Sequence, residues 1–329
     1  MLVLVSCDAF ASTNADHAQE IAMRDYLQRL ASALVSRGDA RSLALASIIG
    51  ESEATRSWMD GKSMMFVESK DGPHDASGLR HSALASAGDD VLVYVLLLSG
   101  TSESGRQSRA DAAARWAQLE TDNLAPALAL GSGVEVLPPT LDTYGRMDLH
   151  YVEQLRWIVD SVLADPPTSA EAKALYVGQV NTADKFASLL ATGLWAMTSL
   201  PFGELVRSCK GEALHAEDSR RERCRRVAGV LSENSDTLLG RAIGLAMQAN
   251  VAEEGERPLI AERRRRHDWQ MTQWALISAE NETKNSNEFL RRVEDPRNSS
   301  EIDVMDMMLA EAGIPSAPPA GWKSERALP

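Results

Sequence analysis

Residues 112–131 read AAARWAQLETDNLAPALALG and predict a helix, a tight polar turn and a second helix. Alanine and leucine, both strong helix formers, dominate the two halves, and few β-branched residues oppose them. The turn TDN at 121–123 supplies side chains that satisfy the free N–H groups at a helix start. Pro126 falls in the first turn of the second helix, where a missing N–H costs least, and Gly131 ends it. This helix pair is the unit from which α-solenoids are assembled.

The order of residues in this pair resembles the junction between tetratricopeptide repeats. Trp116 is followed by Leu119 and Glu120, then by an Asp-Asn turn and a helix of small residues. Thr121 stands where that family usually has proline. The resemblance covers residues 112–131 and implies a protein of helical hairpins whose grooves bind peptides or protein partners.

Two more segments, 16–49 and 224–246, predict helix pairs of the same kind. Asp39, Asp122 and Asp236, the last together with Ser235, are the expected caps of the three second helices. Their spacings are 83 residues (122 − 39) and 114 residues (236 − 122), and neither is a multiple of the 34-residue tetratricopeptide unit. We therefore expect an all-α fold of roughly ten or more helices, either an irregular helix-hairpin array of the α-solenoid or tetratricopeptide type or a bundle.

The pattern divides the chain into three parts. Residues 1–14 are the remnant of a signal or lipoprotein segment, 15–312 form the helical-repeat-like domain, and 313–329 form an irregular tail with several prolines. The loop 131–146 is the expected bend or boundary inside the domain, and a helix is predicted from Met147 to Leu163.

The N-terminus is typical of an exported protein. The sequence AFA at 9–11 supplies the small residues that a signal peptidase needs, and LVSC at 4–7 resembles a bacterial lipobox, which makes Cys7 a candidate for lipidation. A basic n-region is missing from the sequence as given, so an apolar start of a cytoplasmic protein is the alternative. We expect a periplasmic or lipid-anchored protein whose only membrane contact is through Cys7.

Cys209 and Cys224, which are 15 residues apart, are the candidate disulfide. Two other interpretations stay open: free buried thiols, or a zinc site that includes His215. The spacing fits no known zinc module and a fourth ligand is missing, so no metal site is assigned.

One continuous apolar run, Val91–Leu98, fits either a buried strand or a helix capped by Asp89 and Asp90. The run precedes Gly100 and Ser102, so the strand interpretation would place Ser102 on the nucleophile elbow of a serine hydrolase. The second glycine of that motif is replaced by Ser104, and a plain helix–loop–helix turn is favoured.

Composition narrows the function classes. The 329 residues carry a formal net charge of -13, which disfavours binding to nucleic acid, and no apolar run reaches the length of a membrane span. The basic block 263–266 is interpreted as a solvated helix face, and His267 as a partly buried packing residue. No glycine-rich phosphate loop or dinucleotide fingerprint is present, so no cofactor is expected.

These patterns favour a helical-repeat-like scaffold of the bacterial cell envelope that binds a protein or peptide partner and has no assigned catalytic activity. The alternative is an exported hydrolase, which would use either Ser102 or a glutamate that no motif identifies, as in glycan-cleaving enzymes.

Overall fold

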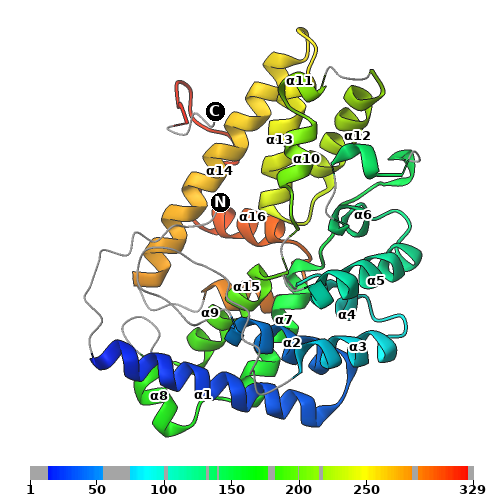
Figure 1. The fold of residues 1–329 in the computed structure, drawn as a ribbon. Coiled ribbons are helices and arrows are strands. Elements are labelled where there is room, and N and C mark those ends of the chain that lie inside the picture. The colour runs from blue at the N-terminus through cyan, green and yellow to red at the C-terminus, as the bar shows by residue number, and fades with distance from the viewer. Residues whose placement is uncertain are drawn as a thin grey trace. The chain divides into compact units, whose positions relative to one another are not determined.

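The structure is a computed structural model that describes residues 14–54, 75–99, 103–130, 133–138, 141–176, 182–198, 200–214, 218–283 and 288–324. Over these ranges the protein is all-α, with helices packed in pairs and with isolated bridges as the sole β-type pairing (Figure 1). The predicted fold class is confirmed.

The chain divides into two compact units, each formed by two stretches of sequence. Unit 1 comprises Met1–Trp116 and Gln154–Ser199, and unit 2 comprises Ala117–Glu153 and Leu200–Pro329. Two helices cross the division, α5 (Glu103–Leu119) and α7 (Tyr151–Ala164). The other helices of unit 1 are α1 (Asn14–Arg37), α2 (Ala40–Ala54), α3 (Ala76–Ser86), α4 (Val91–Leu96), α8 (Ser169–Leu175) and α9 (Ala183–Ala196).

In unit 1, α1 and α2 form the helix pair expected at residues 16–49, and the fully buried side chains between them include Leu27, Leu30, Leu34, Leu45, Ile48 and Ile49. Gly38 between them has a φ of 73°, a left-handed conformation that ends α1 without a side-chain clash. Asp39 then caps α2, accepting hydrogen bonds from the backbone N–H (3.0 Å) and the hydroxyl (2.6 Å) of Ser42. This cap is as predicted.

The apolar run Val91–Leu98 contains helix α4 and no strand. Asp90 caps it, because its carboxylate accepts a hydrogen bond of 3.2 Å from the Leu92 N–H. All but the first side chain of the run are buried, which explains why the run shows neither helical nor strand periodicity.

Unit 2 contains the hairpin of α12 (Asp218–Asn234) and α13 (Leu238–Val251), beside which the long helix α14 (Arg257–Thr283) runs. Helix α16 (Glu301–Glu311) packs against α14 through a cluster that includes Leu238, Ile302 and Met305. The remaining elements of unit 2 are α6 (Ala125–Ala129), α10 (Gly203–Ser208), α11 (Gly211–Leu214), α15 (Glu288–Glu294) and the short 3-10 turns Val134–Val136 and Leu141–Thr143.

Two predicted caps are wrong. The side chain of Asn123, not of Asp122, accepts the hydrogen bond at the start of α6, from the Ala125 N–H at 3.0 Å. Thr237, not Ser235 or Asp236, caps α13. Asp236 does not cap its own helix because its carboxylate bonds to a distant segment, described below.

Among the residues that the structure describes, no helix combines the length and the apolar character that a membrane-spanning segment requires.

Candidate functional site

Cys209 and Cys224 form a disulfide that joins the end of α10 to α12, with their Cα atoms 5.6 Å apart. Both residues are fully buried. The predicted pairing is confirmed, which excludes the free-thiol and zinc interpretations for these sulfurs. His215, the third member of the zinc hypothesis, lies outside the described residues.

Two candidate residues, Cys7 and Ser102, also lie outside the described residues, so their predicted roles stay predictions. The nucleophile elbow needs a strand before the serine, and the structure places helix α4 there instead. Within the described ranges, no three His, Cys, Asp or Glu side chains are grouped so that they could hold a metal ion.

A cluster of polar residues in unit 2 lies where three loop segments meet, and we call it the polar junction. It consists of residues 120–125, 145–151 and 234–238 together with Glu301. The Leu124 N–H donates to the Arg146 carbonyl oxygen (2.8 Å), and the Met147 N–H donates to that of Asn234 (2.9 Å). Each contact is a single parallel bridge, too short to form a sheet, so side chains complete the junction.

Asn123 is the centre of the junction and is 1% exposed. Its side-chain oxygen accepts from the N–H groups of Ala125 and Asp148, each at 3.0 Å. Its amide nitrogen donates to the Glu120 carboxylate at 2.9 Å and to the Asp148 carbonyl oxygen at 2.8 Å. The side chain therefore uses all of its hydrogen-bonding capacity to fasten two segments together.

Arg146 neutralises the carboxylates around it. Its guanidinium lies 2.9 Å from Glu120, 3.3 Å from Asp122 and 2.7 Å from Asp148. Burial by itself lowers the pKa of Arg146, but hydrogen bonds to Glu120 and Asp122 outweigh that effect and raise it. The guanidinium is permanently charged here.

His150 has a φ of 52°, the one left-handed conformation among the described residues other than glycine. Its ring nitrogen Nε2 lies 3.1 Å from the Glu120 carboxylate, and its backbone N–H donates to the Asp148 carboxylate at 2.8 Å. This backbone turn stops helical geometry from extending toward Met147. The helix predicted from Met147 therefore starts four residues later, as α7 at Tyr151.

Two buried acids complete the junction. One oxygen of Asp236 accepts from the Tyr151 N–H at 3.0 Å, so Asp236 caps α7 across a long separation in sequence. The Glu301 carboxylate accepts from the Leu238 N–H at 2.7 Å. Burial raises the pKa of Asp236 well above its ordinary value, and the neighbouring Asp148 raises it further; burial also raises the pKa of Glu301 to about 7.

Chemically, the junction can hold protons on Asp236 and Glu301, the two acids whose pKa values are raised. The side chains of the junction nevertheless form their hydrogen bonds with backbone N–H groups and with one another. This arrangement fixes the relative positions of three segments and caps a helix, which is a structural role.

A second candidate lies on α14. Spacings of three and four residues place one set of side chains on a single side of this helix. This α14 face consists of Ala261, Arg264, Arg265, Asp268, Thr272 and Leu276. A shallow hollow of about 220 Å³ opens on the face, lined by four of these residues and by Ser324 of the C-terminal tail. Leu276, further along, is 61% exposed.

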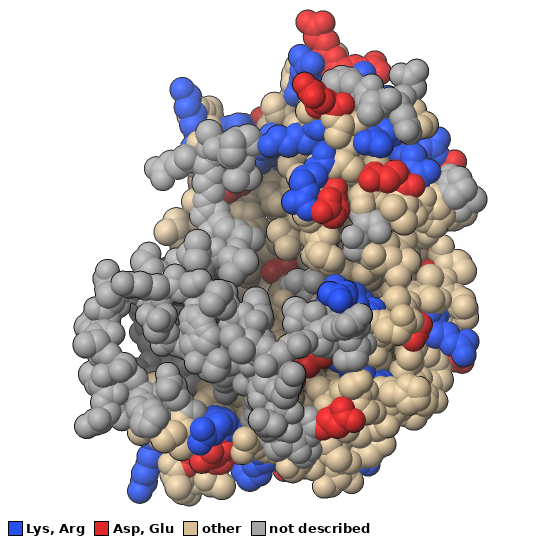
Figure 2. All heavy atoms as spheres, in the orientation of Figure 1, with Lys and Arg blue, Asp and Glu red and all other residues tan. Residues whose placement is uncertain are grey.

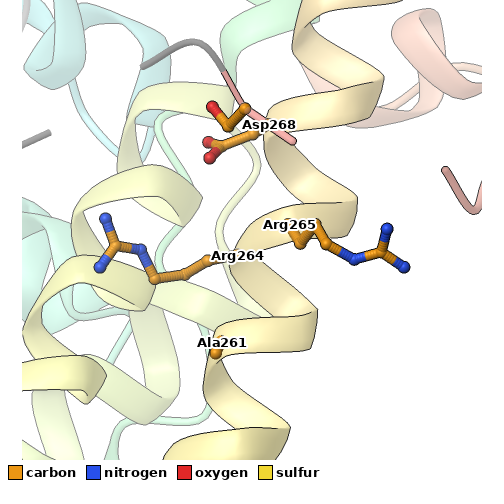
Figure 3. A pocket seen from close by; sticks show the side chains of 5 residues that line it. Ala261, Arg264, Arg265 and Asp268 are labelled. Carbon is orange, nitrogen blue, oxygen red and sulfur yellow. The ribbon is translucent and has the colours of Figure 1, made fainter. Parts of the chain in front are cut away.

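Figure 3 shows how the hollow is built: from the α14 face, the side chains of Arg264 and Arg265 extend in opposite directions, and Asp268 lies one turn further on. Arg265 pairs with Glu262 at 2.8 Å, whereas no described residue forms an ion pair with Arg264. The tail is held beside the helix by Trp322, whose ring meets that of Trp269 edge-on at 5.5 Å between centroids. One cation therefore remains available to a ligand.

The surface charges of unit 2 are mixed. On the face shown in Figure 2, basic and acidic side chains alternate around the end of the unit that carries α11, with no field of one sign. The basic block pairs in part, since Arg263 contacts Glu233 and Arg265 contacts Glu262. His267 is 6% exposed, which confirms its prediction as a buried packing residue.

The sequence did not reveal the polar junction. Arg146, Asp148, His150 and Glu301 belong to no spaced motif, and the contacts that join the segments, such as Asn123–Asp148 and Leu238–Glu301, link residues that are far apart in the chain. The available signal was Asp148 three residues before the true start of α7, a spacing typical of a polar residue that precedes a helix.

Comparison with known proteins gives no match: none of the family models, curated proteins or solved structures resembles the chain significantly.

Proposed function

We propose that the protein is an exported scaffold of the bacterial cell envelope that binds a protein or peptide partner on the α14 face. The observation that carries the proposal is this face itself. It offers an arginine that forms no ion pair with a described residue, a shallow hollow and an exposed leucine on one side of a single helix.

The disulfide supports export. Disulfides form and persist mainly in oxidising compartments, and the two cysteines are part of the core of unit 2. Together with the signal-like sequence before residue 13, it favours a periplasmic or lipid-anchored protein. The test is to fractionate cells and to sequence the mature N-terminus; cytoplasmic protein that starts at Met1 would refute this part of the proposal.

The α14 face defines the chemistry of the partner. Arg264 is suited to a carboxylate, and Leu276 about three turns further along the helix is suited to an apolar side chain. A peptide or protein segment with an acidic residue followed by an apolar one would satisfy both. Such use of a helix face agrees with the peptide binding that the tetratricopeptide resemblance implies.

The alternative, an exported hydrolase, has less support. Helix α4 stands where a serine hydrolase needs a strand, and Glu301, a partly buried glutamate, accepts a hydrogen bond from a backbone N–H and helps to cap α13. Labelling with an activity-based serine probe and a peptidoglycan digestion assay would detect either activity.

Site-specific photo-crosslinking tests the binding face. A photoreactive amino acid at Thr272 lies on the α14 face, and the same group at Leu259, 65% exposed, lies on the opposite side of the same helix as a matched control. We expect a discrete crosslinked product in the cell envelope from position 272 only. Excess purified protein should compete it away, and Arg264→Glu should weaken it. Equal products from both positions, or none from position 272, would refute the binding face.

A further inference from the structure

The carboxyl groups of Asp148 and Asp236 meet inside the polar junction. The Asp236 N–H donates to the carbonyl oxygen of Met147 at 3.0 Å, which brings the two aspartates side by side. The Asp148 carboxyl group raises the pKa of Asp236 both through its charge and through a side-chain hydrogen bond. We call them the carboxyl pair.

The four carboxyl oxygens of the pair differ in the hydrogen bonds that they accept. Asp148 accepts from the His150 N–H at 2.8 Å and from the Arg146 guanidinium at 2.7 Å. One oxygen of Asp236 accepts from the Tyr151 N–H, and a backbone hydrogen bond from Leu149 also stabilises the carboxylate, whereas Oδ1 is buried and has no hydrogen-bond partner of ordinary geometry among the described residues. A buried acceptor without a donor is costly unless the acid itself carries the missing proton.

We propose that the carboxyl pair shares one proton, held on Asp236 and donated to Asp148, and that loss of this proton loosens the polar junction. Asp148 already accepts hydrogen bonds from Arg146 and from the His150 N–H, so Asp148 is the acceptor of the pair and Asp236 is the donor. Asp236 is 8% exposed and forms no ion pair with a described basic residue, so a second negative charge there would be both buried and repelled.

The other titratable groups around the pair favour the same protonation state. Glu120 is occupied by Arg146 and His150. Burial raises the pKa of the Tyr151 phenol, and the nearby Glu301 and Asp236 raise it further, so Tyr151 stays neutral. Glu301 donates its backbone N–H to the Asp236 carbonyl oxygen at 2.9 Å, so ionisation of its carboxyl group adds negative charge beside the pair.

The consequence is a junction that is closed in acid and opened by base. Folded Asp236 keeps a proton that the unfolded chain releases above its ordinary pKa of about 4. This contribution to stability is therefore complete at low pH and is lost as the pH rises through the ionisation of the folded pair. When the proton leaves, the two carboxylates repel each other, and segments 145–151 and 234–238 are no longer joined through them.

The variant Asp236→Asn isolates this effect, because an asparagine amide donates permanently to Asp148 while its oxygen still accepts from the Tyr151 N–H. One shared proton makes the unfolding equilibrium constant of the natural protein rise tenfold per pH unit in the window. Between the ordinary pKa of about 4 and the ionisation of the folded pair, the rise per pH unit should be about tenfold smaller in Asp236→Asn. Glu301→Gln is the control that removes the other buried acid, and it must retain the contribution of the pair.

An Asp236→Asn variant with the same pH dependence as the natural protein would overturn the proposal. A second measurement needs no variant: the hydrogen-exchange protection factor of the Tyr151 amide should fall as the pH rises, ahead of global unfolding. Protection of that amide that stays constant until the whole chain unfolds would also overturn it.

Discussion

The sharpest test of the packing in unit 2 is Gly244→Ala, where α13 crosses α12. A Cβ atom at this position would lie 2.3 Å from the Ser232 backbone nitrogen and 2.7 Å from the Leu231 carbonyl carbon. Cβ atoms in proteins essentially never approach other heavy atoms closer than 3.0 Å. Because backbone atoms supply these contacts, no side-chain rotation relieves them, and the two helices must move apart by roughly 1 Å.

The expected magnitude follows from two opposing effects. Overpacking of a tight interface costs about 1–3 kcal/mol, and rigid backbone contacts place this site at the upper end. Alanine has a higher helix propensity than glycine, which raises the free energy of unfolding by about 1 kcal/mol. The free energy of unfolding should therefore fall by about 2 kcal/mol.

Gly229→Ala is the matched control. Gly229 lies on α12, and a Cβ there would meet no heavy atom within 4 Å, so only the helix propensity acts. This variant should be more stable than the natural protein by about 0.5–1 kcal/mol. Urea unfolding followed by far-UV circular dichroism gives both values. The reasoning fails if Gly244→Ala is as stable as the natural protein, or if the two variants shift in the same direction.

Three other predictions concern single contacts. Replacing Cys209 and Cys224 by alanine should lower the free energy of unfolding by about 3 kcal/mol, measured by urea unfolding, and stability equal to that of the oxidised protein would contradict it. Burial lowers the pKa of His267 to about 4, so the stability of the protein should fall as the pH drops from about 6.5 toward 4. In acid titrations followed by fluorescence, His267→Asn should remove that loss of stability. A titration curve that is unchanged in the variant would refute this prediction. Arg80, fully buried and 2.8 Å from Glu51, should cost about 3–5 kcal/mol when changed to methionine, and Glu51→Met in the same chain should recover part of the thermal stability; no recovery would contradict the pairing.

Local signals explain what the sequence could predict. Gly38 and Asp39 stop one helix and start the next through contacts within four residues, and the structure shows both. The pairing of Cys209 with Cys224 followed from their number and spacing. Asp90 was correctly named as a possible cap of the run that starts at Val91, although the run alone did not distinguish a helix from a strand.

Non-local contacts explain what the sequence could not predict. Asp236 stands one residue before Thr237, the cap of α13, and aspartate is as suitable a capping residue as threonine. Its actual partner, the Tyr151 N–H, lies 85 positions away in the sequence. Nothing in the sequence indicates that His150 has a left-handed backbone conformation. The surrounding hydrogen bonds impose this conformation, which delays the start of α7. The hollow on the α14 face could not be predicted either, because Ser324 of the C-terminal tail forms part of its lining.

Asn123 carries a consequence for the chemical ageing of the protein. Asparagine deamidates when the backbone nitrogen of the following residue attacks the side-chain carbonyl carbon. Here that nitrogen, on Leu124, is bound to the Arg146 carbonyl oxygen, and the asparagine side chain is held by four hydrogen bonds. Conversion to aspartate would set a new carboxylate against Glu120. The folded junction therefore protects its own central residue, and loss of ammonia at Asn123 should mark molecules that have already opened.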